Sequence, residues 1–300
     1  MTAKARLGRI AYLNVLPIYF ALEHIFGENG FQLVRGTPAE LNALMRRGAV
    51  DLGSISAMEY GRACKDYLLL PDLSISSQGA VGSVLLFSRV PFSRLDGRTV
   101  QVSAASASGA ALVKVLMAKL FEVQPRYQHG QLGEAALKDC AAVMVIGDEA
   151  LALKAAGTMS FELDLGEAWQ ELTGLPFVFG VWAVRRDFVE TQPEATRALH
   201  RLLLRSRDWG LASLKQLSRI AAAPGGMSPA QVLAYFHQLN FFLTPEHEEG
   251  LATFFHYLYN LGELAEEPRL EYFGVKQSAD SSENCHPHPS PPQGGGRKGK

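Results

Sequence analysis

A single polar side chain, Asn14, interrupts the apolar stretch RIAYLNVLPIYFAL over residues 9–22, and Pro17 follows it three positions later. Proline is well tolerated in the first turn of a helix, so we expect a strand to end near Asn14 and a helix to begin near Pro17. A neutral amide at such a junction can donate a hydrogen bond to a carboxylate without exchanging a proton. It can equally cap the helix. Asn14 is therefore either a ligand of a small anion or a helix cap.

Ser54 and Ser56 lie where the stretch VDLGSIS meets an expected helix over residues 57–65. Backbone N–H groups point outward at the start of a helix, so this position favours an anion. Ser56 can also cap the helix, with Glu59 completing a capping box three residues later. Because the capping box explains Glu59, we do not expect it to be the catalytic base. Tyr60 either lines a cleft or packs in the core.

Small residues mark two further positions that could contact a ligand. Gly82 and Ser83 in GAVGSV would let the backbone approach a ligand beside a hydroxyl, although Ser83 can also be an ordinary strand residue after a turn. Ser106 and Ser108 precede an expected helix over residues 109–122. There they can offer hydroxyl and N–H groups to a carboxylate.

Titratable groups give weaker signals. Asp148 follows an expected strand end, where it either touches a ligand or caps a helix. His24, His129 and His200 have no Ser, Cys or carboxylate at the spacing of a recognisable hydrolytic motif, so we expect no catalytic triad.

The elements that must position these residues alternate between short apolar runs and helical patterns. Thr37 and Glu40 carry the capping-box signature of one such helix. We expect one lobe from residues 1–89 together with 178–276, and a second lobe from residues 90–177. Two α/β blocks, two crossings and a helical return indicate an α/β, two-lobed type II periplasmic-binding-protein-like fold. Its ligand cleft would lie between the lobes.

Composition narrows the classes of partner. The 300 residues carry 29 Lys and Arg against 30 Asp and Glu, a balance that suggests neither a nucleic-acid surface nor a polybasic membrane anchor. No apolar stretch approaches the roughly 20 residues that a membrane span needs. The cysteines Cys64, Cys140 and Cys285 are far apart, as expected for reduced thiols, and the start of the chain lacks the pattern of a signal peptide. We expect a cytoplasmic protein that binds a small molecule.

The last segment, residues 277–300, is polar and rich in Pro, Gly and Ser, so we expect it to be disordered. Cys285, His286 and His288 imitate a metal site there. Because prolines separate them in a flexible tail, we expect no metal to bind.

Several long motifs stand in a recognisable order: AYLNVLP, VDLGSISAMEY, LLPDLSISSQGAVGSVLLFS, VIGDEAL and DLGEAWQELTGLPFVFGVWAVR. From about residue 7 to about residue 262 the chain resembles the MqnA family, the chorismate dehydratases of the futalosine route to menaquinone. The resemblance implies a lyase without cofactor or metal that removes water from chorismate and gives 3-[(1-carboxyvinyl)oxy]benzoate.

The resemblance also assigns roles to the candidate residues. It implies that Asn14 and Ser83 are catalytic and that the substrate contacts Ser54, Ser56, Tyr60, Gly82, Ser106, Ser108, Gly109 and Asp148. The family pattern resembles Ser-x-Thr-Ser, whereas this chain ends the motif with Gly109 and loses one hydroxyl. Since no convincing base is present, we expect a carboxylate of the substrate itself to take the ring proton.

Two alternatives stay open from sequence alone. One is the sister enzyme of the same pathway, 1,4-dihydroxy-6-naphthoate synthase, which shares the fold. The other is a non-catalytic protein that binds small anions, since a fold alone does not establish a function. The sequence does not decide between a monomer and a homodimer.

Overall fold

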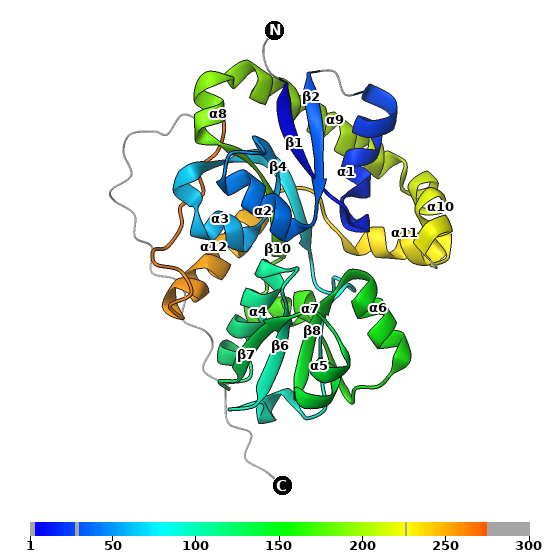
Figure 1. The fold of residues 1–300 in the computed structure, drawn as a ribbon, viewed down its shortest axis with the longest axis vertical. Coiled ribbons are helices and arrows are strands. Elements are labelled where there is room, and N and C mark those ends of the chain that lie inside the picture. Colours follow the sequence, from blue (N-terminus) through cyan, green and yellow to red (C-terminus); the bar gives the residue numbers. More distant parts are fainter. Residues whose placement is uncertain (1–3, 28–29, 226, 275–300) are drawn as a thin grey trace.

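The alternating strands and helices form two five-stranded sheets in the computed structural model, which describes residues 4–27, 30–225 and 227–274 (Figure 1). The first sheet has the order β2-β1-β3-β10-β4. Its strands are β1 (Ala5–Ile10), β2 (Phe31–Gly36), β3 (Leu52–Ser56), β4 (Tyr67–Ser77) and β10 (Phe177–Arg185). The second sheet has the order β7-β6-β8-β5-β9. Its strands are β5 (Val84–Ser88), β6 (Thr99–Ser103), β7 (Arg126–Gly130), β8 (Ala142–Ile146) and β9 (Phe161–Asp164). The expected two-lobed α/β fold is confirmed.

Both sheets are mainly parallel with one inserted antiparallel strand. β10 runs antiparallel between β3 and β4, and β5 runs antiparallel between β8 and β9. The chain therefore enters the second lobe before Val84. The sequence patterns had placed this crossing after residue 89. All five residues of β5 are buried, which suits a strand inside the second sheet as well as one inside the first. Sequence patterns alone could not distinguish these two positions.

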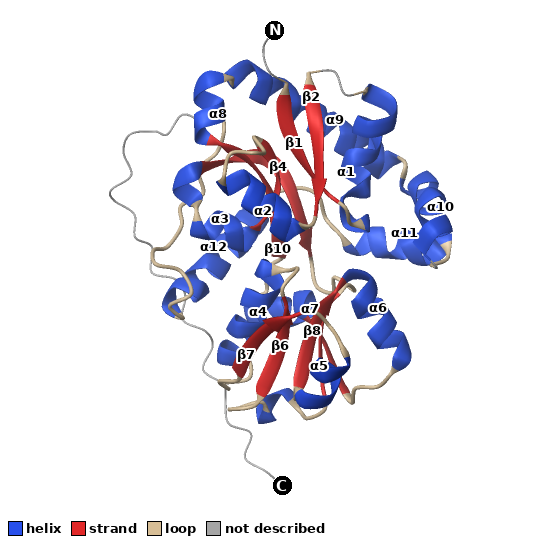
Figure 2. Ribbon diagram, viewed as in Figure 1, coloured by secondary structure: helices blue, strands red, loops and turns tan. Residues whose placement is uncertain are grey.

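Helices cover both sheets (Figure 2). Their bounds are α1 (Leu16–Ala21), α2 (Pro38–Arg46), α3 (Ala57–Arg62), α4 (Ala107–Lys119), α5 (Glu134–Asp139), α6 (Gly147–Ala156), α7 (Leu165–Thr173), α8 (Arg186–Thr191), α9 (Pro193–Ala212), α10 (Leu214–Gly225), α11 (Pro229–Gln238) and α12 (Pro245–Asn260). The helices after β10 return to the first lobe, where α9 packs against α1, as expected. Within the described ranges, no helix is long and apolar enough to cross a membrane.

The two lobes share one hydrophobic core. A single cluster of buried residues includes Trp182 of the first sheet, Phe254 of α12 and Leu112 of α4. Helix α4 belongs to the second lobe by sequence order, yet it contacts α3, α12 and β10 of the first lobe. The lobes are therefore held together along α4.

The sequence signals at helix starts are partly confirmed. Thr37 caps α2 in a complete capping box: its Oγ1 accepts from the N–H of Glu40 at 3.3 Å, and the Glu40 carboxylate accepts from the N–H of Thr37 at 2.8 Å.

The residues of the expected tail, including Cys285, His286 and His288, lie outside the described part of the chain.

Candidate active site between the lobes

A cavity of about 770 Å³ opens between the lobes; we call it the main cavity. Its wall in the first lobe comes from the ends of β1 and β3 and from the start of α2. The second lobe contributes the end of β6 and the starts of α4 and α6. Ligands of open α/β sheets bind at such strand ends. The volume is within the usual range for a small-molecule site, about 300 to 1,000 Å³.

Asn14 lines the main cavity in a short 3-10 helix, Leu13–Val15, between β1 and α1. Neither this segment nor α1 has a side-chain cap hydrogen bond, so Asn14 is not a helix cap. Its Oδ1 is buried and makes no hydrogen bond within the described residues. A buried polar atom that lacks a partner is costly, so this side chain is available to a ligand.

Ser54 lies near the end of β3, and it is one of the residues that line the same cavity. Only 2% of the residue is exposed, and its Oγ has no hydrogen-bond partner among the described residues. Ser56 also lines the cavity but is already occupied as the cap of α3, because its Oγ accepts from the N–H of Glu59 at 3.0 Å. The Ser54 hydroxyl therefore has no partner in the described fold, whereas Ser56 already accepts hydrogen bonds as a helix cap.

The second expected capping box is only half formed. Asn42 takes the place of the Glu59 carboxylate, because the Asn42 Oδ1 accepts from the N–H of Ser56 at 3.4 Å. The Glu59 carboxylate instead pairs with Arg46 and accepts from the Tyr67 hydroxyl at 3.4 Å. Burial raises the pKa of Glu59, and Arg46 opposes this increase. Glu59 is not among the residues that line the main cavity, so it is not placed to act as the base.

The start of α4 presents Ser106 and Ser108 to the cavity from the second lobe. Ser106 caps α4, and its Oγ accepts from the N–H of Gly109 at 3.1 Å. The O–H of Ser108 is already used: it donates to the Phe179 carbonyl at 2.8 Å, and the Oγ accepts from the Met58 N–H at 3.2 Å. Ser108 therefore links α4 to the first lobe, and its expected role as a substrate ligand lacks a free hydroxyl.

Gly109 does not line the cavity but is tightly enclosed. A Cβ atom there would collide with the Met144 Cε and would lie 2.8 Å from the Ser106 Oγ and 3.2 Å from the Val84 Cγ1. Met144 thus occupies the space that a side chain at residue 109 would need. The hydroxyl that the family pattern has at this position is therefore absent here, and the Met144 side chain fills its place.

Ser83 lines the cavity, 6% exposed, at the crossing between the lobes. Its Oγ lies 3.1 Å from the hydroxyl of Tyr235 in α11. Gly82 beside it has a φ of +72°, a conformation that favours glycine, and its N–H donates to Asp164 at 2.7 Å. Gly82 therefore shapes the turn that positions Ser83, and it does not itself line the cavity.

Tyr60, an expected substrate contact, is not among the described residues that line the cavity. Tyr60 is fully buried; its hydroxyl donates to the Arg269 carbonyl at 2.9 Å and accepts from the Glu271 N–H at 3.0 Å. Burial raises the pKa of Tyr60 to about 12. Tyr60 therefore fastens the C-terminal segment to α3, which corrects the expectation that it contacts substrate. Asp148 is in the first turn of α6, but its side chain lies outside the described part of the structure.

Electrostatics in the main cavity depend on backbone groups. None of the residues described as lining it is Lys or Arg, and its two carboxylates are Glu40 and Glu149. Hydrogen bonds from Thr37 lower the pKa of Glu40, so that carboxylate stays ionised and is a weak base. The N-termini of α2, α4 and α6 face the cavity, and each carries roughly half a positive charge. The cavity thus offers N–H and hydroxyl groups to an anion in place of salt bridges.

The sequence missed several lining residues. Gln131 directly follows β7, and Tyr12 lies two residues after β1. Ligands often bind at strand ends, and the same reasoning that selected Asn14 could have selected these two residues. Tyr235 lies within α11, and only tertiary packing brings it to Ser83. Two of the three histidines considered above have partners outside the cavity: His24 pairs with Glu23, and His200 contacts the Pro71 carbonyl.

Comparison with known proteins supports this picture. A family model described as menaquinone biosynthesis matches residues 5–260. A chorismate dehydratase of Thermus thermophilus is 32% identical over 263 residues, which covers 83% of this chain and 93% of that protein. A 1,4-dihydroxy-6-naphthoate synthase of the same organism is 28% identical over 252 residues, covering 82% of this chain and 89% of that protein.

A solved structure shows the fold alone. A Candida albicans gene product with the generic periplasmic-binding-protein fold superposes with a TM-score of 0.68 at 11% identity, covering 93% of this chain and all of that one. Its identity is too low to carry an activity over to this chain.

Proposed function

Since this chain belongs to the menaquinone biosynthesis family, we propose that it is a chorismate dehydratase whose reaction takes place in the main cavity. It removes water from chorismate and gives 3-[(1-carboxyvinyl)oxy]benzoate. The reaction class is that of a carbon–oxygen lyase. No cofactor is required, because the elimination makes the ring aromatic and exchanges no electrons with another molecule.

The chemistry sets what the protein must provide. The ring proton beside the enol-ether oxygen leaves, hydroxide departs from the neighbouring ring carbon, and proton and hydroxide together make one water. Negative charge builds up on the ring carboxylate as the proton leaves. Hydrogen-bond donors that are aimed at this charge lower the barrier. A cavity that excludes water and fixes both carboxylates supplies the rest.

The observation that carries the proposal is the pair of unsatisfied polar groups in the main cavity. The Asn14 Oδ1 and the Ser54 Oγ are buried without hydrogen-bond partners in the described structure, and both residues line one cavity. The Asn14 amide can donate through Nδ2 to a carboxylate or to the departing hydroxyl, which gains negative charge as it leaves, while Oδ1 can accept from another hydrogen-bond donor of the ligand. Both groups remain neutral, so they orient the substrate without competing for its proton.

The proton acceptor in this proposal is the carboxylate of the enolpyruvyl group. Glu59 is outside the cavity, and Glu40 is held ionised by the N–H and hydroxyl of Thr37. Intramolecular proton transfer gains from positioning, which can supply about 7 to 11 kcal/mol in favourable cases. Ser54 at the end of β3 and Ser106 at the start of α4 would hold the two carboxylates in reach.

Ser83 completes the proposed site. Its hydroxyl shares a hydrogen bond with Tyr235, which fixes its orientation at the crossing between the lobes. We assign it a catalytic role beside Asn14, and we assign substrate contacts to Ser54 and Ser106. A cytoplasmic location, with chorismate as the small-molecule partner, is part of the same proposal.

The test is to incubate purified protein with chorismate in the presence of a metal chelator and to follow the products by mass spectrometry. We expect chorismate to lose one water and an enolpyruvyl benzoate to accumulate. Chorismate that binds but stays intact would contradict the proposal and indicate a binding protein. Release of 1,4-dihydroxy-6-naphthoate from the substrate of the sister enzyme, with chorismate unchanged, would indicate the synthase.

A further inference from the structure

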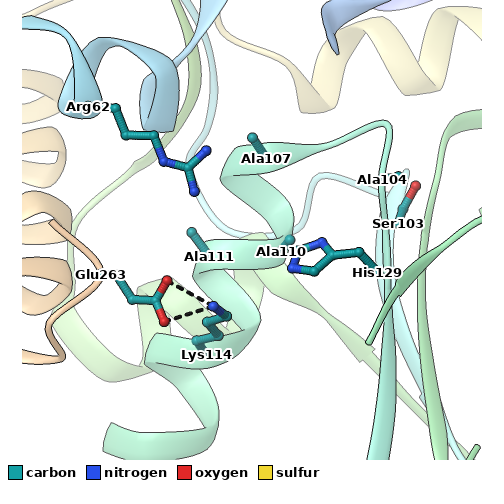
Figure 3. A pocket seen from close by; sticks show the side chains of 9 residues that line it. All are labelled: Arg62, Ser103, Ala104, Ala107, Ala110, Ala111, Lys114, His129 and Glu263. Atoms are coloured by element: carbon teal, nitrogen blue, oxygen red, sulfur yellow. Dashed lines mark hydrogen bonds and ion pairs between the residues drawn. The ribbon is translucent and has the colours of Figure 1, made fainter. Parts of the chain in front are cut away.

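A second, smaller cavity of about 220 Å³ adjoins the main cavity; we call it the side cavity (Figure 3). Its lining residues are Arg62, Ser103, Ala104, Ala107, Ala110, Ala111, Lys114, His129 and Glu263. Ser103, Ala104 and Ala107 line both cavities, so the two spaces meet at the start of α4. The first lobe contributes Arg62 at the end of α3, and the second lobe contributes His129 from β7.

The side cavity holds the cationic groups that the main cavity lacks. The Lys114 ammonium is neutralised, because it lies 2.7 and 2.8 Å from the two carboxylate oxygens of Glu263. Arg62 is exposed and makes no hydrogen bond or ion pair to any described residue, although its charge reaches the Glu59 carboxylate, which itself pairs with Arg46. Figure 3 shows Arg62 extending from α3 over the first turns of α4, and His129 approaching the same turns from β7.

This contrast matters for a substrate with two negative charges. The lining carboxylates Glu40 and Glu149 repel a dianion as it approaches the main cavity. The N-termini of helices attract it only at short range, because their field falls off within about one turn. A guanidinium without an ion-pair partner acts over a longer distance and can hold a carboxylate through paired N–H groups.

We propose that the side cavity is a capture site for carboxylates, in which Arg62 and His129 hold one carboxylate of the incoming dianion before it enters the main cavity. The small side chains of Ala107, Ala110 and Ala111 on α4 leave room for the carbon skeleton beside the bound carboxylate. The identity of the dianion rests on the proposed function. The chemistry of the site, a carboxylate against a guanidinium and an imidazole, does not.

The kinetic test compares the wild type with Arg62→Gln, using Arg219→Gln as the control. Arg219 is an exposed arginine on α10 outside both cavities, so the control removes the same charge elsewhere. We expect Arg62→Gln to lower kcat/KM for chorismate about threefold to tenfold at low ionic strength and to leave kcat unchanged. The loss of kcat/KM should be smaller near 0.3 M salt, where the Debye length is only about 6 Å and the charge of Arg62 is screened. Equal kcat/KM values for both variants at every salt concentration would overturn the proposal.

A binding test works even if the protein does not turn over chorismate. Malonate serves as a small dicarboxylate probe, and the His129 imidazole signals, assigned with His129→Gln, are followed by NMR. We expect millimolar malonate to move these signals in the wild type and in Arg219→Gln but much less in Arg62→Gln. His129 signals that stay unchanged in the wild type would overturn the capture site, whatever the result with chorismate.

Discussion

Two side chains, Asn14 and Ser54, carry the argument at the residue scale, because each keeps a buried polar atom without a partner. Leaving such an atom unsatisfied costs about 1 to 3 kcal/mol. A hydroxyl that served folding would have a partner in the fold, as Ser56 and Ser108 do. The unsatisfied pair therefore indicates hydrogen bonds that form only when a ligand enters the main cavity.

Ser54→Ala should separate function from stability. Removing an unsatisfied hydroxyl should leave the free energy of unfolding unchanged or raise it by up to about 1 kcal/mol, while kcat/KM for chorismate falls about tenfold. The matched control is Ser56→Ala, which loses a helix cap and should lower stability by about 1 kcal/mol. Denaturant unfolding and steady-state kinetics measure both quantities. A Ser54→Ala variant with wild-type kcat/KM would contradict this assignment.

Glu59→Gln tests whether a protein carboxylate takes the ring proton. Glu59 pairs with Arg46 outside the main cavity, so kcat should stay within about threefold of the wild-type value, the scale of a small secondary effect below 1 kcal/mol. The measurement is chorismate turnover by a variant shown to be folded by circular dichroism. Loss of nearly all turnover would mean that Glu59 reaches the substrate in a conformation other than this one.

At the element scale, the start of α4 joins the lobes and forms one wall of each cavity. Its small residues allow this close approach: Gly109 packs against Met144 of β8, and Ser108 bonds to the backbone of the first lobe. The position of α4 relative to β8 therefore sets the shape of the main cavity. A change that moves α4 should affect folding and turnover together.

Gly109→Ala should be destabilising although alanine favours helices. The added methyl group collides with Met144, and overpacking of this kind costs about 1 to 3 kcal/mol. Gly133→Ala is the control, because a Cβ at that exposed position meets no atom within 4 Å and should cost at most about 1 kcal/mol. Equal stability of the two variants in urea unfolding would show that Met144 moves aside freely.

The start of α12 contains a titratable contact that predicts a pH dependence. His247 is buried; its Nε2 accepts from the Asn240 amide at 2.9 Å, and its Nδ1 lies 2.7 Å from the Thr244 hydroxyl. Burial lowers the pKa of His247 in the folded chain. The folded state therefore binds a proton less readily than the unfolded state, so this stabilisation is present above the ordinary pKa of about 6.5 and is lost as the pH falls through the folded value.

Thermal unfolding from about pH 7.5 down to about pH 5 measures this effect across the ordinary pKa of histidine. The wild type should lose more of its Tm over this range than His247→Gln, which keeps a polar side chain but has no group that titrates there. Parallel loss of Tm in the two proteins would mean that His247 does not contribute to the acid sensitivity.

At the scale of the whole molecule, two lobes share a core along α4 and leave the main cavity between them. Sequence patterns predicted this architecture because strand and helix periodicity is local: the run YLLLPDLSISS is β4, and the Thr37 capping box begins α2. They failed where the outcome depends on distant partners. Which sheet receives β5, and whether Tyr60 faces the cavity or the C-terminal segment, is decided by tertiary packing.

For the candidate site, too, local patterns could be read from the sequence and contacts between distant residues could not. Asn14, Ser54 and Ser83 lie at strand ends or crossings, where periodicity marked them as candidates, and the family resemblance was needed to favour a functional role for Asn14 and Ser83. That Ser108 has no free hydroxyl could not be read from the sequence, because its partners lie on α3 and β10.

The most direct test of the account is the turnover of chorismate by Asn14→Ala beside the wild type. Because Asn14 makes no hydrogen bond to the described fold through its Oδ1, we predict an unchanged Tm. The kcat should fall about 10²- to 10³-fold, as expected when a donor to developing charge is removed. A folded Asn14→Ala variant that dehydrates chorismate at the wild-type rate would contradict the account.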